Sequence, residues 1–231
     1  MDNIRLDFQK HIDAGRCNGA EWIINHKNNT YHEVIGYNDL VKNNKLNKNS
    51  YYRIWSMTKP IVGFAAMQLI EKNFLSLDDT IDKYLPNFKN LKKLESLTSK
   101  LDDTIKIDRT PTVRQLLQHT AGFTYNSSNN FLAEGYEENK LFHSSSRSLE
   151  EEVESISGLR LLYEPGSEWH YSISIDILAR IIEIVTDGMC QCLQNAWKDL
   201  MPITIRHQAR EINPQFATLV ESTDSVIICS F

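Results

Sequence analysis

Apolar residues recur at helical spacing in five stretches of the chain. Ile4, Phe8 and Ile12 stand four positions apart, with polar residues between them. This spacing places all three on one face, so the sequence predicts an amphipathic helix over residues 3–14. The same reasoning predicts four more helices: one that Ser56 opens and Asn73 ends, one from Thr110-Pro111 to Ala121-Gly122, one over 149–156, and one from Ser172 or Ser174 to Asp187-Gly188.

Runs typical of strands lie mostly near the N-terminus. Residues 20–25 and 30–37 predict an antiparallel hairpin, because Lys27-Asn28-Asn29 between them is a turn signal. Shorter features are expected elsewhere: extended pieces at 51–55 and 225–231, a helical turn between 75 and 86, and a tight turn at 164–167. Polar stretches predict loops at 38–50, 89–108 and 125–148. The last of these has the length typical of a functional lid.

The composition is that of a soluble, globular protein. The chain has 231 residues, of which 41% are hydrophobic and 24% are charged. It is therefore long enough to bury a core, either as one domain of ordinary size or as a domain with a smaller lobe. The formal net charge is −5 and no basic stripe stands out, which argues against nucleic acid as a partner.

Targeting signals are not visible in the sequence. The N-terminus has no apolar signal segment, and the longest apolar stretch, residues 61–70, is too short to span a bilayer. We therefore expect a cytoplasmic protein without a membrane partner. The four cysteines show no zinc-binding spacing and are expected to be free thiols: Cys17, Cys190, Cys192 and Cys229.

The candidate chemistry begins with Ser56 and Lys59, which stand three residues apart. At helical spacing the two side chains share a face at the first turn, near unpaired backbone N–H groups and the positive end of the helix dipole. This setting predicts a lowered pKa for Lys59, whose neutral amine could then take the proton of Ser56. The alternative is that Ser56 is a helix-start residue and Lys59 a solvated cation.

Three further segments extend this pattern. Residues 75–86 contain Leu-Ser-Leu-Asp-Asp and Tyr-Leu-Pro, and residues 116–123 read Leu-Leu-Gln-His-Thr-Ala-Gly-Phe. Residues 164–172 run from Glu-Pro-Gly to Tyr-Ser. With residues 53–60, these segments resemble, in order, four landmarks of the serine β-lactamase-like hydrolases of the class C and penicillin-binding type. That family includes bacterial esterases and D-amino-peptide hydrolases. The resemblance covers roughly residues 5–187.

The resemblance implies an α/β fold of the α+β type, in which an antiparallel sheet is flanked by helices and accompanied by a helical lobe. It also implies acyl transfer through a Ser56 acyl-enzyme, with Lys59 as general-base partner and Tyr171 as the phenol that relays protons. The Ser56 backbone N–H would serve the oxyanion hole, and Trp169 would line the substrate pocket. Small esters are the expected substrates, ahead of β-lactams and D-amino-acid peptides. No cofactor or metal is implied, and the oligomeric state stays open.

Two departures from the family pattern shape these expectations. Ile173 stands where the family's tyrosine motif has asparagine, which favours an esterase over a β-lactamase. The sequence also lacks the Lys-Thr-Gly or His-x-Gly motif that marks a later sheet strand. We therefore expect an incomplete β-lactamase-like domain over 1–187 and a divergent tail over 188–231, as in a truncated or frame-shifted reading frame. A catalytically silent fragment or pseudoenzyme is the alternative.

Other polar residues near these motifs are interpreted as structural. His119 stands beside a helix C-terminus and is expected to cap backbone groups instead of acting as a base. His170 is expected to point away from Tyr171, because neighbours in an extended run face opposite sides. Asp78 and Asp79 are expected to cap a helix start.

Overall fold

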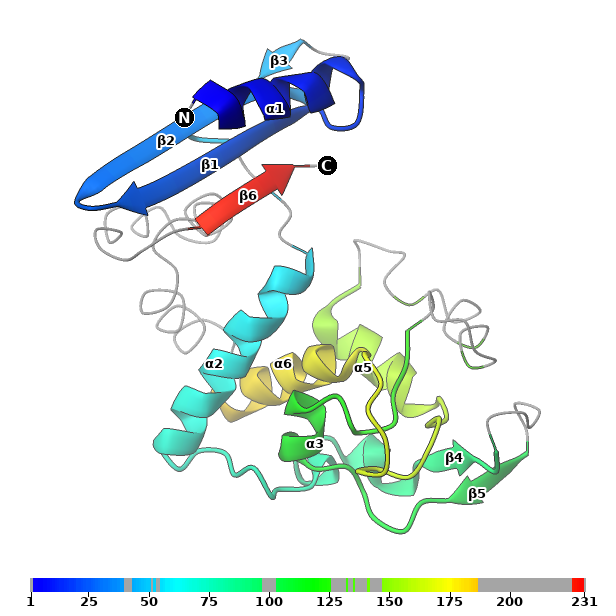
Figure 1. Cartoon of the computed structure of the whole chain (residues 1–231). Coiled ribbons are helices and arrows are strands. Elements are labelled where there is room, and N and C mark those ends of the chain that lie inside the picture. Colours follow the sequence, from blue (N-terminus) through cyan, green and yellow to red (C-terminus); the bar gives the residue numbers. More distant parts are fainter. Residues whose placement is uncertain are drawn as a thin grey trace. The chain divides into compact units, whose positions relative to one another are not determined.

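The structure, a computed structural model, describes residues 2–39, 43–50, 52, 55–96, 103–125, 132, 135, 141, 147–186 and 226–230. The chain divides into two units, whose elements Figure 1 colours along the sequence. Unit 1 comprises Met1–Ser56 and Trp197–Phe231, and unit 2 comprises Met57–Ala196. The domain boundary predicted at residue 187 lies outside the described residues.

The predicted hairpin forms the middle of the sheet in unit 1. Its strands β1 (Gly19–His26) and β2 (Asn29–Asp39) are antiparallel, and Lys27 and Asn28 between them have φ of 46° and 65°. Two positive φ values in a two-residue turn are typical of a type I′ hairpin, whose twist suits the strands. Two shorter strands, β3 (Asn44–Lys45) and β6 (Val226–Ser230), give the order β3-β2-β1-β6. The strand expected at 225–231 is thereby confirmed.

Helix α1 (Asp2–Asp13) packs on this sheet through the apolar face that its sequence predicts. That face contacts the buried side chains of Ala20, Trp22 and Ile35. Phe8 stacks on Trp22, with ring centroids 5.1 Å apart. This aromatic pair is part of a small core in unit 1, in which Trp22 is buried and Phe8 is partly buried.

A buried carboxylate connects the chain ahead of Ser56 to the sheet. Glu21 of β1 is 3% exposed and accepts a hydrogen bond of 2.6 Å from Tyr52 Oη. It also lies 2.5 Å from His32 Nε2. Burial raises the pKa of Tyr52, and the adjoining Glu21 raises it further, so the phenol keeps its proton and is the donor. These bonds compensate the desolvation of the Glu21 charge.

Unit 2 is mainly helical. A 3-10 turn, η1 (Trp55–Met57), crosses the boundary between the units and leads into α2 (Thr58–Glu71). The remaining elements, in chain order, are η2 (Ile81–Lys83), η3 (Pro86–Asn90), β4 (Lys92–Leu94), β5 (Thr104–Lys106), α3 (Val113–Leu117), α5 (Leu149–Ser157) and α6 (Ser174–Val185). Among the described residues, no helix has the length and apolar character needed to cross a bilayer.

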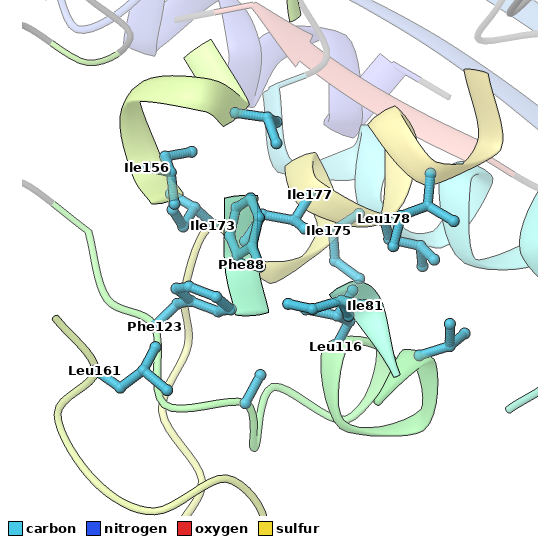
Figure 2. Close-up of a cluster of buried hydrophobic side chains, with 14 of the residues drawn as sticks. Ile81, Phe88, Leu116, Phe123, Ile156, Leu161, Ile173, Ile175, Ile177 and Leu178 are labelled. Atoms are coloured by element: carbon cyan, nitrogen blue, oxygen red, sulfur yellow. The ribbon is translucent and has the colours of Figure 1, made fainter. Parts of the chain in front are cut away.

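Helix α6 is the centre of the core of unit 2. It packs against α2, α3 and α5, and its apolar face is buried as the sequence predicts. Figure 2 shows Ile175, Ile177 and Leu178 of this helix among side chains from the other elements. Phe88 and Phe123 meet edge to face in the same cluster, with ring centroids 6.1 Å apart. This core fixes the segments that enter α6 and leave α3.

Helix α3 begins later and ends earlier than predicted. Its N-cap is Thr112 instead of Thr110, because Thr112 and Gln115 exchange side-chain and backbone hydrogen bonds in a capping box. The helix ends near Leu117 because His119 adopts a left-handed φ of 56°. Glycine or asparagine usually fills that role, so the sequence pattern placed the end at Gly122 instead.

Four other predictions are wrong. Strand β3 lies within the loop predicted at 38–50, and β4 pairs with β5 within the loop predicted at 89–108. Strands of two or three residues are too short to show an alternating pattern. Trp55, expected in an extended piece, lies in η1. Asp78 and Asp79 do not cap a helix but form ion pairs with Arg114 and Lys83, each at 2.8 Å.

Candidate active site

Ser56, the predicted nucleophile, lies in η1 and is exposed. The residue before it, Trp55, has φ of 46° and is 78% exposed. A bulky side chain at positive φ is an outlier, and such strained backbone positions cluster at functional sites. The outlier therefore favours a functional role for the turn that carries Ser56.

Lys59 is the second residue of α2 and meets two phenols within unit 2. Its Nζ donates a hydrogen bond of 2.8 Å to Tyr125 Oη and lies 5.2 Å from the centroid of that ring. Lys59 is also hydrogen-bonded to Tyr171, with Nζ 4.8 Å from the ring centroid. Both distances are within the range of cation–π attraction. The structure thus brings together two residues predicted from the sequence, Lys59 and Tyr171, and adds Tyr125.

The lowered pKa expected for Lys59 is wrong. Burial does lower the pKa of this ammonium, but hydrogen bonds with Tyr125 and Tyr171 and the charge of Asp176 raise it above its ordinary value. Lys59 is therefore a cation at neutral pH. The expectation considered only the helix dipole and burial, and it omitted acceptors that arrive from distant parts of the chain.

Tyr125 is the site residue that the sequence interpretation missed. Burial and the charge of Asp176 raise its pKa, and together they outweigh the opposing effect of Lys59. Tyr125 is therefore a neutral phenol that accepts a hydrogen bond from the Lys59 ammonium. In the sequence it opens the polar stretch 125–148, and its one signal is its place two residues after the landmark segment 116–123.

Asp176 supplies negative charge to this cluster from the first turn of α6. Burial raises the pKa of its carboxyl, as does the charge of Glu152, although Lys59 and a backbone hydrogen bond oppose the shift. Asp176 in turn raises the pKa of both Lys59 and Tyr125. Among the residues that the structure describes, no group of three or more His, Cys, Asp or Glu could hold a metal ion.

A row of aromatic rings runs from the two phenols to Trp169. The ring centroids of Tyr125 and Tyr171 are 5.7 Å apart, and those of Tyr171 and His119 are 5.0 Å apart. Trp169 meets His119 edge to face at 6.5 Å and is 67% exposed. The structure places Trp169 at one end of this row. Its role as a wall of the substrate pocket stays a prediction.

The two histidines differ in their contacts. His119 accepts backbone hydrogen bonds on both sides of Tyr171, at its carbonyl from His170 N–H (2.9 Å) and at Nδ1 from Ser172 N–H (3.2 Å). His119 therefore binds backbone groups, as expected, but these are N–H groups at 170 and 172 and not groups at the end of α3. His170 Nε2 lies 3.1 Å from Thr124 Oγ1. The expectation that its ring points away from Tyr171 stays a prediction.

Ile173 is fully buried in the core of unit 2, where Figure 2 labels it beside Phe88 and Ile177. The third position of the tyrosine motif therefore contributes to packing. An amide at this position would lie in the apolar core that holds α6.

The antiparallel sheet of unit 1 and the helices of unit 2 define a β-lactamase/transpeptidase-like fold of the α+β type. Residues 4–201 match the protein-family model described as Beta-lactamase, and the chain belongs to that family.

Known proteins similar to this chain include hydrolases and an acyltransferase. Esterase EstB of Burkholderia gladioli is 28% identical over 192 residues, which are 79% of this chain and 45% of EstB. Acyltransferase calJ of Penicillium decumbens is 30% identical over 179 residues, which are 75% of this chain and 42% of calJ. The structure of EstCE1, a hydrolase with promiscuous acyltransferase activity, gives a TM-score of 0.68 at 26% identity and covers 99% of this chain and 59% of EstCE1. This chain thus spans less than half the length of EstB and calJ.

Proposed function

We propose that this chain is a serine hydrolase that cleaves small esters through an acyl-enzyme on Ser56. The observation that carries the proposal is the Lys59 ammonium held by Tyr125 and Tyr171, on the helix that begins directly after the turn containing Ser56. A serine hydroxyl is a poor nucleophile unless a nearby group takes its proton. Similarity to an esterase and to a hydrolase with acyltransferase activity supports the same reaction class.

In the acylation step, the Tyr171 phenolate, paired with the Lys59 ammonium, removes the proton of Ser56 Oγ. The Oγ–carbon bond to the acyl group forms, the bond from that carbon to the alcohol oxygen breaks, and the alcohol leaves with the proton from Tyr171. In the second step, a water molecule gives a proton to Tyr171 and the water oxygen attacks the acyl carbon. The bond between that carbon and Ser56 Oγ then breaks, and Ser56 recovers its proton from Tyr171. The products are an acid and an alcohol.

The cationic state of Lys59 assigns it a different role from the general base expected from the resemblance. We propose that it stabilises the phenolate of Tyr171, because an opposite charge within about 4–6 Å favours the charged form of a group. Tyr125, as a neutral acceptor, keeps the ammonium oriented. Amides and β-lactams, which would react by the same chemistry, rank below esters because Ile173 offers no side-chain amide.

A fluorophosphonate probe tests this proposal on the purified chain. Attack by Ser56 forms an oxygen–phosphorus bond and releases fluoride, so the label stays on the nucleophile. We expect labelling of the native protein and none of Ser56→Ala. Tyr171→Phe removes the proton acceptor, so its labelling rate should fall by about 100-fold or more.

Tyr125→Phe is the matched control, because it removes one phenolic oxygen from the same lysine. It should label more slowly than the native protein but faster than Tyr171→Phe. Native protein that melts cooperatively and takes up no label would contradict the proposal and favour a catalytically silent member of the family.

A further inference from the structure

Three contacts of His119 surround Tyr171. The His119 carbonyl accepts the N–H of the residue before Tyr171, and Nδ1 accepts the N–H of Ser172, the residue after it. The imidazole also packs against the Tyr171 ring, with centroids 5.0 Å apart and planes inclined by 35°. One residue thus restrains the backbone on both sides of the phenol and the orientation of its ring.

The geometry points to His119 as a positioning residue that holds Tyr171 in the orientation needed to exchange protons with Ser56. This inference rests on the proposed function, in which Tyr171 is the proton acceptor. It goes beyond helix capping, because a backbone cap alone would require neither the ring nor Nδ1.

The left-handed conformation of His119 makes this arrangement possible. With φ of 56°, the residue ends α3 and directs its carbonyl away from the helix, toward His170 N–H. Glycine would adopt this φ with less strain, but it has no acceptor for Ser172 N–H. Histidine therefore combines a conformation it adopts more readily than most residues with a side-chain acceptor at the δ position.

The hydrogen bonds also define the protonation state of the imidazole. Nδ1 accepts from Ser172 N–H, so a neutral His119 carries its proton on Nε2. Ser172 Oγ lies 3.3 Å from the same nitrogen and 2.7 Å from Ser174 Oγ, and it accepts from Ser174 N–H. A second proton on the ring would place Nδ1–H against the N–H of Ser172 and break the contact.

The surroundings oppose that second proton. Burial lowers the pKa of His119, and the charges of Lys59 on α2 and of His170 lower it further. Among the described residues, the rings of Tyr171 and Trp169 also pack against the imidazole. The charge of Asp176 acts on Lys59 and Tyr125. Because the pKa is lowered on folding, the contact is complete above the ordinary histidine pKa of about 6.5 and is lost as the pH falls through the lower folded value.

Two variants separate the side-chain acceptor from the backbone conformation. His119→Gly and His119→Asn both tolerate positive φ, but only asparagine keeps an acceptor at the δ position. His119→Gly should lower the saturating acylation rate of a p-nitrophenyl ester on the order of 10- to 100-fold, with the half-saturating ester concentration unchanged. His119→Asn should lose about threefold or less. Below about pH 6.5 its rate should fall less steeply than that of the native protein, because the asparagine acceptor does not take up a proton.

His170→Asn is the control, because it removes the neighbouring histidine, which contacts Thr124 instead of Tyr171. This variant should keep the native rate at neutral pH. Its acid limb should remain and move to slightly higher pH, because His170 lowers the pKa of His119. Equal rates for the native, His119→Gly and His119→Asn proteins would overturn the inference. The inference would also be overturned if His119→Gly and His119→Asn lost rate equally and that loss matched their loss of folded protein.

A second readout does not depend on activity. Tyrosine labelled with ¹³C at Cζ gives a resonance that Tyr171→Phe identifies by its disappearance. The resonance and its titration midpoint should move in His119→Gly and stay nearer the native values in His119→Asn. An unmoved resonance in His119→Gly contradicts the positioning role, whereas absence of acylation in the native protein contradicts the proposed function alone.

Discussion

Lys59 is the residue whose protonation state decides how Ser56 is activated. The sequence predicted the Ser-x-x-Lys pair and Tyr171, because motif spacing is visible in one dimension. It did not predict the raised pKa, because the phenol of Tyr125 lies 66 positions further along the chain and reaches Lys59 only in the fold. Electrostatics at this site therefore follow from tertiary contacts and not from the local helix.

The pH dependence of acylation tests the role assigned to Lys59. Its raised pKa keeps the ammonium through the neutral range, so the reactive fraction is set by the Tyr171 phenolate. The rate of fluorophosphonate labelling should rise by about tenfold per pH unit between about pH 7 and pH 9. A plateau over this range would instead indicate a neutral lysine base.

Lys59 also links this site to stability at high pH. Because its pKa is raised on folding, its interactions with the two phenols stabilise the fold fully below the ordinary lysine value and are lost as the pH rises through the folded value. The free energy of unfolding should therefore fall at strongly alkaline pH.

Ile173 offers a test of whether the tyrosine motif can be returned to the family pattern. Ile173→Asn places an amide in a fully buried apolar site, so it should cost about 3–5 kcal/mol of unfolding free energy in a urea titration. Ile184→Asn, the same change at a position of α6 that is 39% exposed, should cost about 0.5 kcal/mol or less. A stable Ile173→Asn protein that gains hydrolysis of a chromogenic cephalosporin would contradict the packing role given to position 173.

At the scale of elements, the long amphipathic helices were predictable and the short pieces were not. α1, α5 and α6 each bury one apolar stripe, and the sequence shows the spacing of that stripe. The ends of α3 depend on a capping box and on a histidine at positive φ, and neither has a reliable pattern. β4 and β5 form because their strands pair with each other and Leu94 is buried, which a polar composition conceals.

Gly122 tests the packing of the segment between α3 and Tyr125. Its φ is 90°, and a Cβ there would lie 2.7 Å from the carbonyl oxygen of Tyr163. Gly122→Ala should therefore destabilise the protein by about 1–3 kcal/mol more than Gly15→Ala. Gly15 also has positive φ, but a Cβ there meets no atom within 4 Å. Equal shifts in the urea midpoints of the two variants would show that backbone conformation alone is responsible.

At the scale of the whole molecule, the order of four landmark segments predicted the family and the fold class. The family match over residues 4–201 and the likeness to EstCE1 confirm both. The sequence interpretation did not anticipate the division after Ser56, because the chain there reads as one continuous approach to a helix. The division reflects the contacts within each unit. One of these contacts joins distant parts of the chain, because β6 pairs with β1.

The most direct measurement is the mass of the protein during turnover of a p-nitrophenyl ester, quenched in acid and mapped by peptide. The proposed reaction predicts one acyl group on the peptide that contains Ser56, and none on the Ser56→Ala protein. Folded native protein that gains no acyl group, or an acyl group that persists in Ser56→Ala, would contradict it.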